Sequence, residues 1–278
     1  MTTKIIAKEV SILSYNTWQL PLIAFTAKKP RHRSVAIAEY FRKNARDIVL
    51  LQEVFTKKAY SEISQAFDEI GYHGTKRQKS SLMKKKLFNS GLAIFSKYPI
   101  VETKFQSYRN CQGEDCLSNK GMLAVLLEIE PGEYIYVVNT HLQAGDNRKR
   151  VFKREKQIDQ LEEFLNSDFF VKDIPIILGG DFNTNKGEDD YHYLISRLEV
   201  EEMQLTGPLT FSHDSTLNDN LLGKKKKDKK LLDYILIMNN KNYNYLNSFR
   251  IIRPKGSYLN YKDVDLSDHF AVEAIVNI

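Results

Sequence analysis

Runs in which apolar residues alternate with polar ones, or stand together in short blocks, recur along the whole chain. Where turn-forming residues bound them, such runs predict β-strands. The expected strands cover residues 10–15, 48–51, 92–95, 123–129, 134–139, 174–178, 231–238 and 270–276. Apolar residues spaced three and four apart predict helices over residues 32–44, 57–70, 148–166 and 189–197. The pattern therefore predicts an α/β protein.

The order of these elements separates two kinds of α/β fold. Between residues 92 and 141 the expected strands follow one another without a helical pattern between them. A parallel sheet needs a crossover connection between successive strands, so this region favours mixed sheets that are covered by helices. The chain contains neither an internal repeat nor a linker rich in Pro, Gly and Ser, and we expect residues 1–278 to form a single domain.

Composition argues against wholesale disorder and against a membrane-spanning helix. Of the 278 residues, 42% are hydrophobic and 27% are charged, as in an ordinary globular protein. The longest apolar runs, such as residues 48–51 and 124–127, are four residues long, whereas a membrane-spanning helix needs ~20. The N-terminal residues lack the apolar core of a secretory signal. This pattern fits a cytoplasmic protein, a signal-independent export route or a trimmed secreted chain.

The net charge is concentrated in one segment. The formal charge is +6, and residues 224–230, which are six lysines and one aspartate, contribute +5 of it. Proteins that bind nucleic acids usually spread basic residues over a face or groove, so a nucleic-acid partner is not expected. This segment and the lysine-rich residues 76–86 are interpreted as exposed loops.

The two cysteines, Cys111 and Cys116, are too few for a disulfide scaffold or for a zinc site made of four thiolates. The sequence is compatible with two reduced thiols and with one disulfide that closes a short loop. A redox role is a weaker alternative to a structural or incidental one.

Polar residues that can carry chemistry stand at the ends of the expected strands. Loops at strand ends, held by a rigid scaffold, are the usual place for an active site. Any one of these residues alone would more often be a turn former, a helix cap or a structural histidine. Together they place acids, amides and imidazoles at separate strand ends, and they are Asn16, Glu53, His141, Asp181, Asn183, Asp268 and His269.

The residue types at these ends fit the hydrolysis of a phosphate ester. The carboxylates of Glu53, Asp181 and Asp268, together with neutral amide oxygens, suit Mg²⁺, Mn²⁺ or Ca²⁺ rather than zinc. His141 and His269 can transfer protons near neutral pH. The sequence contains neither a Gly-x-x-x-x-Gly-Lys-Ser/Thr loop nor a Gly-x-Ser-x-Gly motif, so nucleotide-driven transfer and a serine hydrolase are not supported.

A series of short motifs, in this order along the chain, resembles the endonuclease/exonuclease/phosphatase superfamily. They are Ser-Tyr-Asn-Thr-Trp (14–18), Leu-Gln-Glu-Val (51–54), Asn-Thr-His-Leu-Gln (139–143), Gly-Asp-Phe-Asn (180–183), Leu-Asp-Tyr-Ile (232–235) and Ser-Asp-His (267–269). Within that superfamily the chain looks most like the bacterial-type neutral sphingomyelinases. The segments that carry this narrower resemblance are residues 90–100, 117–121, 140–144 and 210–218.

The resemblance implies a fold and a reaction. The fold is a four-layered α/β sandwich of the DNase I-like kind, in which two mixed β-sheets pack face to face and are flanked by helices. The reaction is a Mg²⁺-dependent hydrolysis of the phosphodiester of sphingomyelin, which yields ceramide and phosphocholine. Mn²⁺ and Co²⁺ are expected substitutes for Mg²⁺.

The resemblance also assigns roles on the metal side of the site. Asn16 and Glu53 are expected to hold the metal, and Asp268 to support them. Asp181 and Asn183 would flank the phosphate and the attacking water.

The proton-transfer and substrate-contact roles follow from the same motifs. His269 would be the general base, oriented by Asp233, and His141 would stabilise the developing charge or assist the leaving group. Asn218 and Lys120 lie in segments that resemble the family and are expected to contact the substrate phosphate.

A phospholipid membrane surface that carries sphingomyelin is the expected partner, and a monomer is expected. Members that act on bilayers expose an aromatic hairpin before Ser-Asp-His, whereas residues 253–261 offer Tyr258, Leu259 and Tyr261 without a tryptophan. This segment is equally compatible with an ordinary β-hairpin. The lysines of residues 224–230 offer an alternative contact with an anionic membrane surface.

Alternative functions remain open at this point. The same scaffold could serve an inositol-lipid phosphatase or a nuclease, and a lysophospholipid with a choline head group is a credible alternative substrate. A membrane-binding or partner-binding protein without activity is a further alternative, although none of the expected catalytic groups is missing from the sequence.

Overall fold

The protein is described by a computed structural model that covers residues 8–21, 30–80, 86–201, 204–223, 227–238 and 248–278. Two parts of the lysine-rich segments, residues 81–85 and 224–226, lie outside the described residues. The helices are Pro30–Asn44 (α1), Lys57–Glu69 (α2), Arg148–Leu165 (α3) and Asp189–Leu198 (α4), with a short 3-10 helix, η2, at Gly113–Leu117. The strands are Glu9–Gln19 (β1), Ile48–Val54 (β2), His73–Gly74 (β3), Ala93–Ser96 (β4), Ile100–Ser107 (β5), Gly121–Glu130 (β6), Glu133–His141 (β7), Ile176–Asp181 (β8), Val200–Glu201 (β9), Gln204–Thr206 (β10), His213–Asp214 (β11), Lys229–Lys230 (β12), Asp233–Met238 (β13), Ser248–Ile252 (β14), Lys255–Tyr258 (β15), Tyr261–Asp265 (β16) and Ala271–Asn277 (β17).

Most of the strands form two mixed sheets. One sheet has seven strands in the order β10-β14-β17-β1-β2-β4-β3, and the other has six in the order β5-β6-β7-β8-β13-β9. Each sheet contains a parallel pair at its centre, β1 with β2 and β7 with β8, while β17 and β13 run antiparallel beside these pairs. The predicted mixed sheets are therefore confirmed.

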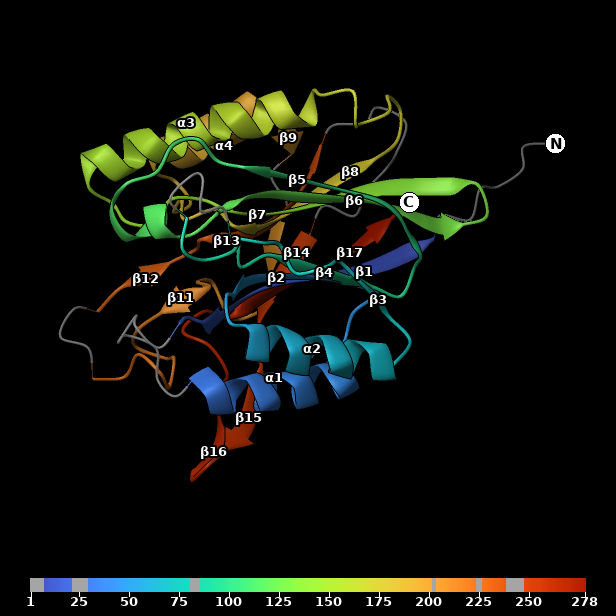
Figure 1. Ribbon diagram of the computed structural model, residues 1–278. Coiled ribbons are helices and arrows are strands. Elements are labelled where there is room, and N and C mark those ends of the chain that lie inside the picture. Colours follow the sequence, from blue (N-terminus) through green and yellow to red (C-terminus); the bar gives the residue numbers. More distant parts are fainter. Residues whose placement is uncertain (1–7, 22–29, 81–85, 202–203, 224–226, 239–247) are drawn as a thin grey trace.

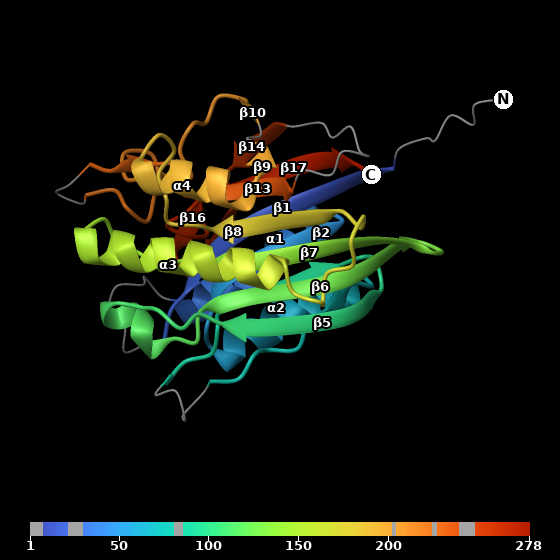
Figure 2. The ribbon, with the colours of Figure 1, turned by 90° about the horizontal axis from the view of Figure 1, so that it is seen from above.

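The two sheets pack face to face between two layers of helices (Figure 1). Helices α1 and α2 cover the outer face of the seven-stranded sheet, and α3 and α4 cover the outer face of the six-stranded sheet (Figure 2). Helix α2 shows why: Ala59, Ile63, Ala66 and Phe67 recur three and four residues apart, so one apolar stripe is buried on the sheet. This is the four-layered sandwich that the sequence predicts.

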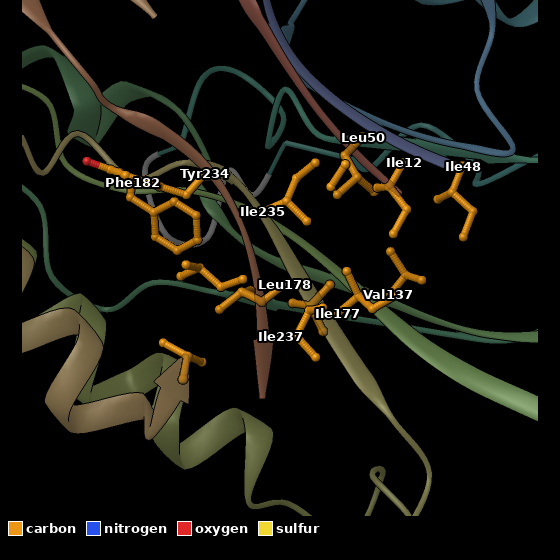
Figure 3. Close-up of a cluster of buried hydrophobic side chains, with 14 of the residues drawn as sticks. Ile12, Ile48, Leu50, Val137, Ile177, Leu178, Phe182, Tyr234, Ile235 and Ile237 are labelled. Atoms are coloured by element: carbon orange, nitrogen blue, oxygen red, sulfur yellow. The ribbon is translucent and has the colours of Figure 1, made fainter. Parts of the chain in front are cut away.

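Alternation along β1 assigns its residues to two cores, because successive side chains of a strand point to opposite faces. Ile12 belongs to the cluster between the sheets, which also contains Leu50, Val137 and Ile177 (Figure 3). Leu13 belongs instead to a smaller cluster under α1 and α2. The large core thus joins both sheets. At the ends of the strands, the same alternation decides which polar side chains point into the space between the sheets.

The predicted helices and strands are all present, with ends that differ by a few residues. The strand β5 was not predicted from the sequence, because it lies at the edge of its sheet, has no fully buried residue and is mostly polar. The segment before Ser-Asp-His, for which the sequence allowed two interpretations, forms the antiparallel hairpin β15–β16. Within the described residues, no helix combines the length and the apolar character that crossing a membrane requires.

Candidate active site

Five strand ends meet at one edge of the sandwich, between the two sheets. His141 and Asp181 are register partners at the ends of the parallel strands β7 and β8. Asp233 opens β13 directly opposite Asp181. Asn16 follows Ile12 and Ser14 in the alternation of β1, so its side chain faces the other sheet. His269 stands just before β17, and all five side chains are buried.

Asp181 lies at the centre of this arrangement. Its Oδ2 atom accepts a hydrogen bond of 2.9 Å from the Nδ2 of Asn16. The same oxygen lies 3.5 Å from the Nε2 of His141 and 3.9 Å from the Nε2 of His269. The other oxygen, Oδ1, accepts a hydrogen bond from the backbone N–H of Asn183 at 3.0 Å. One carboxylate oxygen therefore stands between two imidazoles.

A glycine fixes the spacing between His141 and Asp181. Gly180 precedes Asp181 and pairs with Thr140 in the register of β7 and β8. A Cβ atom at Gly180 would lie 2.0 Å from the backbone oxygen of Thr140, far inside van der Waals contact. Only glycine allows the two strands to approach this closely at the edge that carries the site.

His269 is held by Asp233. The Nδ1 of His269 lies 2.8 Å from the Oδ2 of Asp233, which leaves its Nε2 on the side of Asp181. Ser212 fixes Asp233 in turn, because its Oγ accepts the backbone N–H of Asp233 at 3.2 Å. Ser212 also accepts the N–H of Phe270, next to His269, with its carbonyl oxygen at 2.7 Å. One serine thus joins both ends of the histidine–aspartate pair.

The charges around His269 favour its protonated form. Burial alone lowers the pKa of His269, but the nearby carboxylates of Asp233 and Asp181 outweigh this effect and raise the pKa well above its usual value. The hydrogen bond that His269 donates to Asp233 also raises the pKa of His269. Without a cation nearby, these carboxylates therefore stabilise the imidazolium form of His269.

His141 has the opposite surroundings. The Nζ of Lys120 lies 3.0 Å from its Nε2, and burial followed by the charge of Lys120 lowers the pKa of His141 to about 3. Lys120 is itself buried, and its Nζ also donates to the carbonyl oxygen of Leu142 at 3.0 Å and lies 3.0 Å from the Oδ2 of Asp115. The ammonium of Lys120 therefore has two hydrogen-bond partners and one ion-pair partner.

One side of the site carries an excess of negative charge. Glu53 has a backbone φ of 58°, which breaks the alternation of β2. Its Oε2 is buried and has no hydrogen-bond partner among the described residues. Burial and then the charge of Asp268 raise the pKa of Glu53 to about 8. A buried carboxylate oxygen without a partner, beside a second carboxylate, is a suitable site for a cation.

A second group also meets the distances for a metal ion. Ligand atoms of Asp181, Asp233 and His269 all lie within 4.8 Å of one another. However, the Oδ2 of Asp233 and the Nδ1 of His269 already bond to each other, and this group contains a nitrogen ligand that Mg²⁺ does not favour. The chemistry of the ligand atoms therefore favours a site at Glu53 and Asp268 over one at Asp181, Asp233 and His269 for a Mg²⁺ ion.

The residues expected to contact the substrate have partners within the protein. The Nδ2 of Asn218 donates to the carbonyl oxygen of Ser267 at 3.0 Å, and its Oδ1 accepts the backbone N–H of Asn220 at 2.9 Å. Asn218 thus supports the backbone just before Asp268 and His269. Asn183 donates from its Nδ2 to the carbonyl oxygen of Leu142 at 3.2 Å. Their expected contact with a phosphate stays a prediction.

Sequence reasoning missed several residues that shape the site. Ser212 and Asp115 act through Asp233 and Lys120, as described above. The ring of His213 lies edge-on to His269, with centroids 5.1 Å apart. Cys111 and Cys116 form a disulfide beside Asp115, which is one of the two states that the sequence left open. Asp115 carried one signal, its place in the segment just ahead of residues 117–121.

Comparison with known proteins identifies the class to which this fold and site belong. Residues 13–269 match the Endonuclease/Exonuclease/phosphatase family, and the chain belongs to this family of phosphoester hydrolases. The family and enzyme class expected from the sequence are therefore confirmed.

Its relatives include several proteins named sphingomyelinase. Sphingomyelinase C of Listeria ivanovii is 26% identical over 94% of this chain and 84% of its own length. Sphingomyelinase C of Bacillus cereus is 25% identical over 100% of this chain and 89% of its own length. Sphingomyelinase C 2 of Leptospira interrogans is 28% identical, but only 39% of its length is covered.

Solved structures share the fold. Sphingomyelinase C from Streptomyces griseocarneus has a TM-score of 0.83 and 22% identity, with 98% of this chain and 100% of that one covered. A double mutant of beta toxin from Staphylococcus aureus, with bound magnesium ions, has a TM-score of 0.82 and 22% identity at the same coverage. TDP2 of D. rerio, in complex with a single-strand DNA product, reaches 0.70 at 16% identity over 97% of this chain and 99% of that one. The fold alone therefore does not decide the substrate.

Proposed function

We propose that this protein is a Mg²⁺-dependent phosphodiester hydrolase that cleaves sphingomyelin to ceramide and phosphocholine. The observation that carries the proposal is the position of the Asp181 Oδ2 atom, 3.5 Å from the Nε2 of His141 and 3.9 Å from the Nε2 of His269. Two buried histidines with opposite pKa shifts on either side of one carboxylate provide a base and a charge-stabilising group. The names of the relatives support the choice of sphingomyelin as the substrate.

Asn16, Glu53 and Asp268 are the residues that would hold the metal. The buried Oε2 of Glu53 without a partner and the repulsion between Glu53 and Asp268 fit a divalent cation. Carboxylate and amide oxygens fit Mg²⁺, with Mn²⁺ or Co²⁺ as substitutes. When bound, this cation would offset the carboxylates, polarise a phosphoryl oxygen and bring the pKa of His269 back towards neutrality.

His269 is the proposed general base. Asp233 bonds to its Nδ1, so the proton of the neutral ring stays on that nitrogen and the Nε2 is left to take a proton from water. Ser212 holds Asp233 and the backbone next to His269 together, which limits rotation of the ring. Asp181, whose Oδ2 lies 3.9 Å from that Nε2, would orient the attacking water, with Asn183 next to it.

His141 and Lys120 form the proposed counterpart on the other side of the phosphate. His141 stays neutral at physiological pH, and the ammonium of Lys120 at 3.0 Å adds a fixed positive charge. This pair would stabilise the negative charge that grows on the phosphoryl oxygens and assist departure of the ceramide oxygen. Asn218 contributes by fixing Ser267, and its contact with the phosphate remains part of the proposal.

The proposed partner is a phospholipid membrane surface, and the proposed state is a monomer that binds no nucleic acid. At the tip of the hairpin β15–β16, Leu259 and Tyr261 are exposed, while Tyr258 packs on Tyr261 with ring centroids 5.4 Å apart. Exposed apolar side chains at a hairpin tip suit insertion among lipid head groups.

The test is release of phosphocholine from sphingomyelin vesicles in Mg²⁺, with EDTA as the metal-free arm. His269→Ala is compared with His192→Ala, which removes an exposed histidine of α4 outside the site. We expect activity in the unmodified chain and in His192→Ala, and its loss in EDTA and in His269→Ala.

Parallel assays with phosphatidylcholine, a choline lysophospholipid, an inositol phospholipid and plasmid DNA decide the substrate. Hydrolysis of one of these in place of sphingomyelin would retain the metal-dependent chemistry and overturn the substrate. Inactivity on every substrate would support a binding protein instead of an enzyme.

A further inference from the structure

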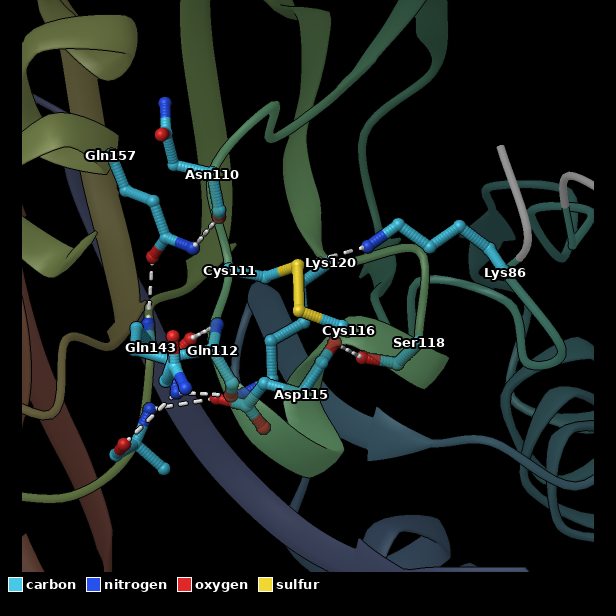
Figure 4. The surroundings of a disulfide bond; sticks show 11 residues. Lys86, Asn110, Cys111, Gln112, Asp115, Cys116, Ser118, Lys120, Gln143 and Gln157 are labelled. Atoms are coloured by element: carbon cyan, nitrogen blue, oxygen red, sulfur yellow. Dashed lines mark hydrogen bonds and ion pairs between the residues drawn. A yellow bond between two sulfur atoms is a disulfide. The ribbon is translucent and has the colours of Figure 1, made fainter. Parts of the chain in front are cut away.

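A chain of contacts joins the disulfide-bridged turn to His141. Figure 4 shows the turn with Cys111, Asp115 and Cys116, together with Lys120. The turn is formed by residues 111–116, which overlap η2, and the sulfurs of Cys111 and Cys116 close it. The Oδ2 of Asp115 lies 3.0 Å from the Nζ of Lys120, and that Nζ lies 3.0 Å from the Nε2 of His141. An acid of the turn is therefore one side chain away from the proposed active-site histidine.

The same oxygen of Asp115 has a second partner. It accepts a hydrogen bond of 2.8 Å from the backbone N–H of Ala144, in the loop that follows His141. Asp115 thus ties the ammonium of Lys120 and the backbone beyond His141 to one point. A lysine ammonium is a point charge on a flexible four-carbon stem, so its position depends on such fixed acceptors.

The disulfide fixes the turn at the residue next to Asp115. On the other side of the turn, the Oε1 of Gln143 accepts the N–H of Gln112 at 2.7 Å, and the Nε2 of Gln157 donates to the carbonyl oxygen of Asn110 at 2.7 Å. These bonds hold the chain before Asp115. The bond from Cys116 back to Cys111 closes a ring that contains Asp115 and reduces the number of conformations open to it.

We propose that Asp115 is a positioning residue for the Lys120–His141 pair and that the Cys111–Cys116 disulfide holds Asp115 in place. This inference rests on the proposed function, because it concerns the residues that hold Lys120 and His141, the proposed charge-stabilising pair, in position. Asp115 touches neither the substrate nor the reacting atoms and acts through Lys120. Loss of Asp115 or of the disulfide lets the ammonium move and weakens stabilisation of the transition state more than binding of the substrate.

The first experiment compares Asp115→Asn with Glu114→Gln in sphingomyelin hydrolysis. Asparagine keeps an oxygen that can accept the N–H of Ala144 but removes the charge that faces Lys120. Glu114 is the adjacent acid of the same turn, and it pairs with Arg150 at 2.8 Å on the outside. We expect kcat to fall about fivefold in Asp115→Asn, with KM within about twofold of that of the unmodified chain. Glu114→Gln is expected to match the unmodified chain, and Asp115→Glu to recover part of the loss.

The second experiment reduces the disulfide in the unmodified chain and in Asp115→Asn. The water-soluble phosphine TCEP is oxidised to its phosphine oxide with an oxygen from water, while Cys111 and Cys116 each gain one electron and one proton. Both cysteines are partly exposed, and a thiol assay confirms two thiols per chain. Reduction is expected to lower kcat about fivefold in the unmodified chain and less than twofold in Asp115→Asn, because the disulfide acts through Asp115. An unchanged rate after reduction, or effects that multiply in the variant, would overturn the proposal.

A readout without activity separates this proposal from the proposed function. The ring ¹⁵N resonances of His141, assigned with a His141→Gln variant, report the contact between its Nε2 and Lys120. They are expected to shift on reduction and in Asp115→Asn, and to stay in place in Glu114→Gln. If the chain hydrolyses none of the substrates, these shifts still support the positioning role. If the resonances do not move, Asp115 does not position the pair.

Discussion

The two histidines of the site share burial and a neighbour, Asp181, yet their pKa values shift in opposite directions. Burial lowers the pKa of both. At His269 the carboxylates of Asp233 and Asp181 reverse this effect, whereas at His141 the ammonium of Lys120 adds to it. The protonation state of each ring is thus set by the charged groups that lie next to it.

The largest effect on activity is expected from Glu53, which lies with Asp268 and Asp181 among the carboxylates on the side of His269. Glu53→Gln removes a proposed metal ligand but keeps its size, and we expect kcat for sphingomyelin to fall at least about a thousandfold. It also removes repulsion with Asp268, so Tm without metal is expected to stay the same or rise. In the unmodified chain, Mg²⁺ at 100 times its Kd is expected to raise the free energy of unfolding by about 2.7 kcal/mol. Scanning calorimetry with Mg²⁺ and with EDTA measures both effects, and a Mg²⁺-dependent rise in Tm that survives in Glu53→Gln would contradict the assignment.

The next effect concerns the group that makes His269 differ from His141. Asp233→Asn keeps the shape of the side chain but removes the negative charge that faces Nδ1. We expect kcat to fall about a hundredfold or more, because a neutral amide orients the ring more weakly and does not stabilise its positive charge once Nε2 has taken a proton. Steady-state kinetics with His192→Ala as the control measures this. A loss of less than tenfold would mean that Asp233 is not needed to orient the base.

The third effect is on the stability of the fold in acid, and it tests the lowered pKa of His141, the histidine beside Lys120. The unfolded chain protonates His141 near its usual pKa of about 6.5, and the folded chain only near 3. The depressed pKa of His141 therefore makes its full contribution to the free energy of unfolding above pH 6.5. That contribution is lost as the pH falls from 6.5 towards 3. Between pH 7 and pH 5 the loss from this residue is about 2 kcal/mol.

Urea unfolding at both pH values, in the unmodified chain and in His141→Gln, isolates that contribution. Glutamine does not titrate and still offers an oxygen to Lys120. An equal loss of unfolding free energy in both chains would show that His141 is not held neutral by its surroundings.

The smallest of these four effects is expected from Lys120, which is the positively charged neighbour of His141. Lys120→Met removes the charge and keeps most of the stem, and we expect kcat to fall about tenfold with little change in KM. Lys156→Met is a matched control, since Lys156 is exposed on α3 and pairs with Asp159 at 2.9 Å. An unchanged kcat in Lys120→Met would remove Lys120, and with it Asp115, from the functional site.

Much of the site could be predicted because it continues the pattern that builds the core. Ile12 and Asn16 share one face of β1, and Val137 and His141 share one face of β7, so alternation places both polar residues between the sheets. Short motifs at strand ends therefore identify groups that lie far apart in the sequence. Glu53 departs from this logic, because its positive φ turns the side chain away from the alternation of β2.

The supporting contacts could not be predicted, because they do not follow any periodic pattern. The contacts of Asp115 with Ala144 and Lys120 depend on the antiparallel pairing of β6 with β7 and on the path of the turn that the disulfide closes. Ser212 meets Asp233 across a long stretch of chain that includes residues outside the described ranges. Such pairings depend on the final packing and leave no signal in the order of apolar and polar residues.

Gly180 has a consequence for how this site can change. Because a methyl group there would collide with the backbone oxygen of Thr140, the width of the gap between His141 and Asp181 is set by two main chains. Side-chain variation at either strand end can alter charge or reach, but it cannot widen that gap. The separation of His141 from Asp181 is thus a fixed dimension of the scaffold, and adaptation to a bulkier substrate has to come from the loops around it.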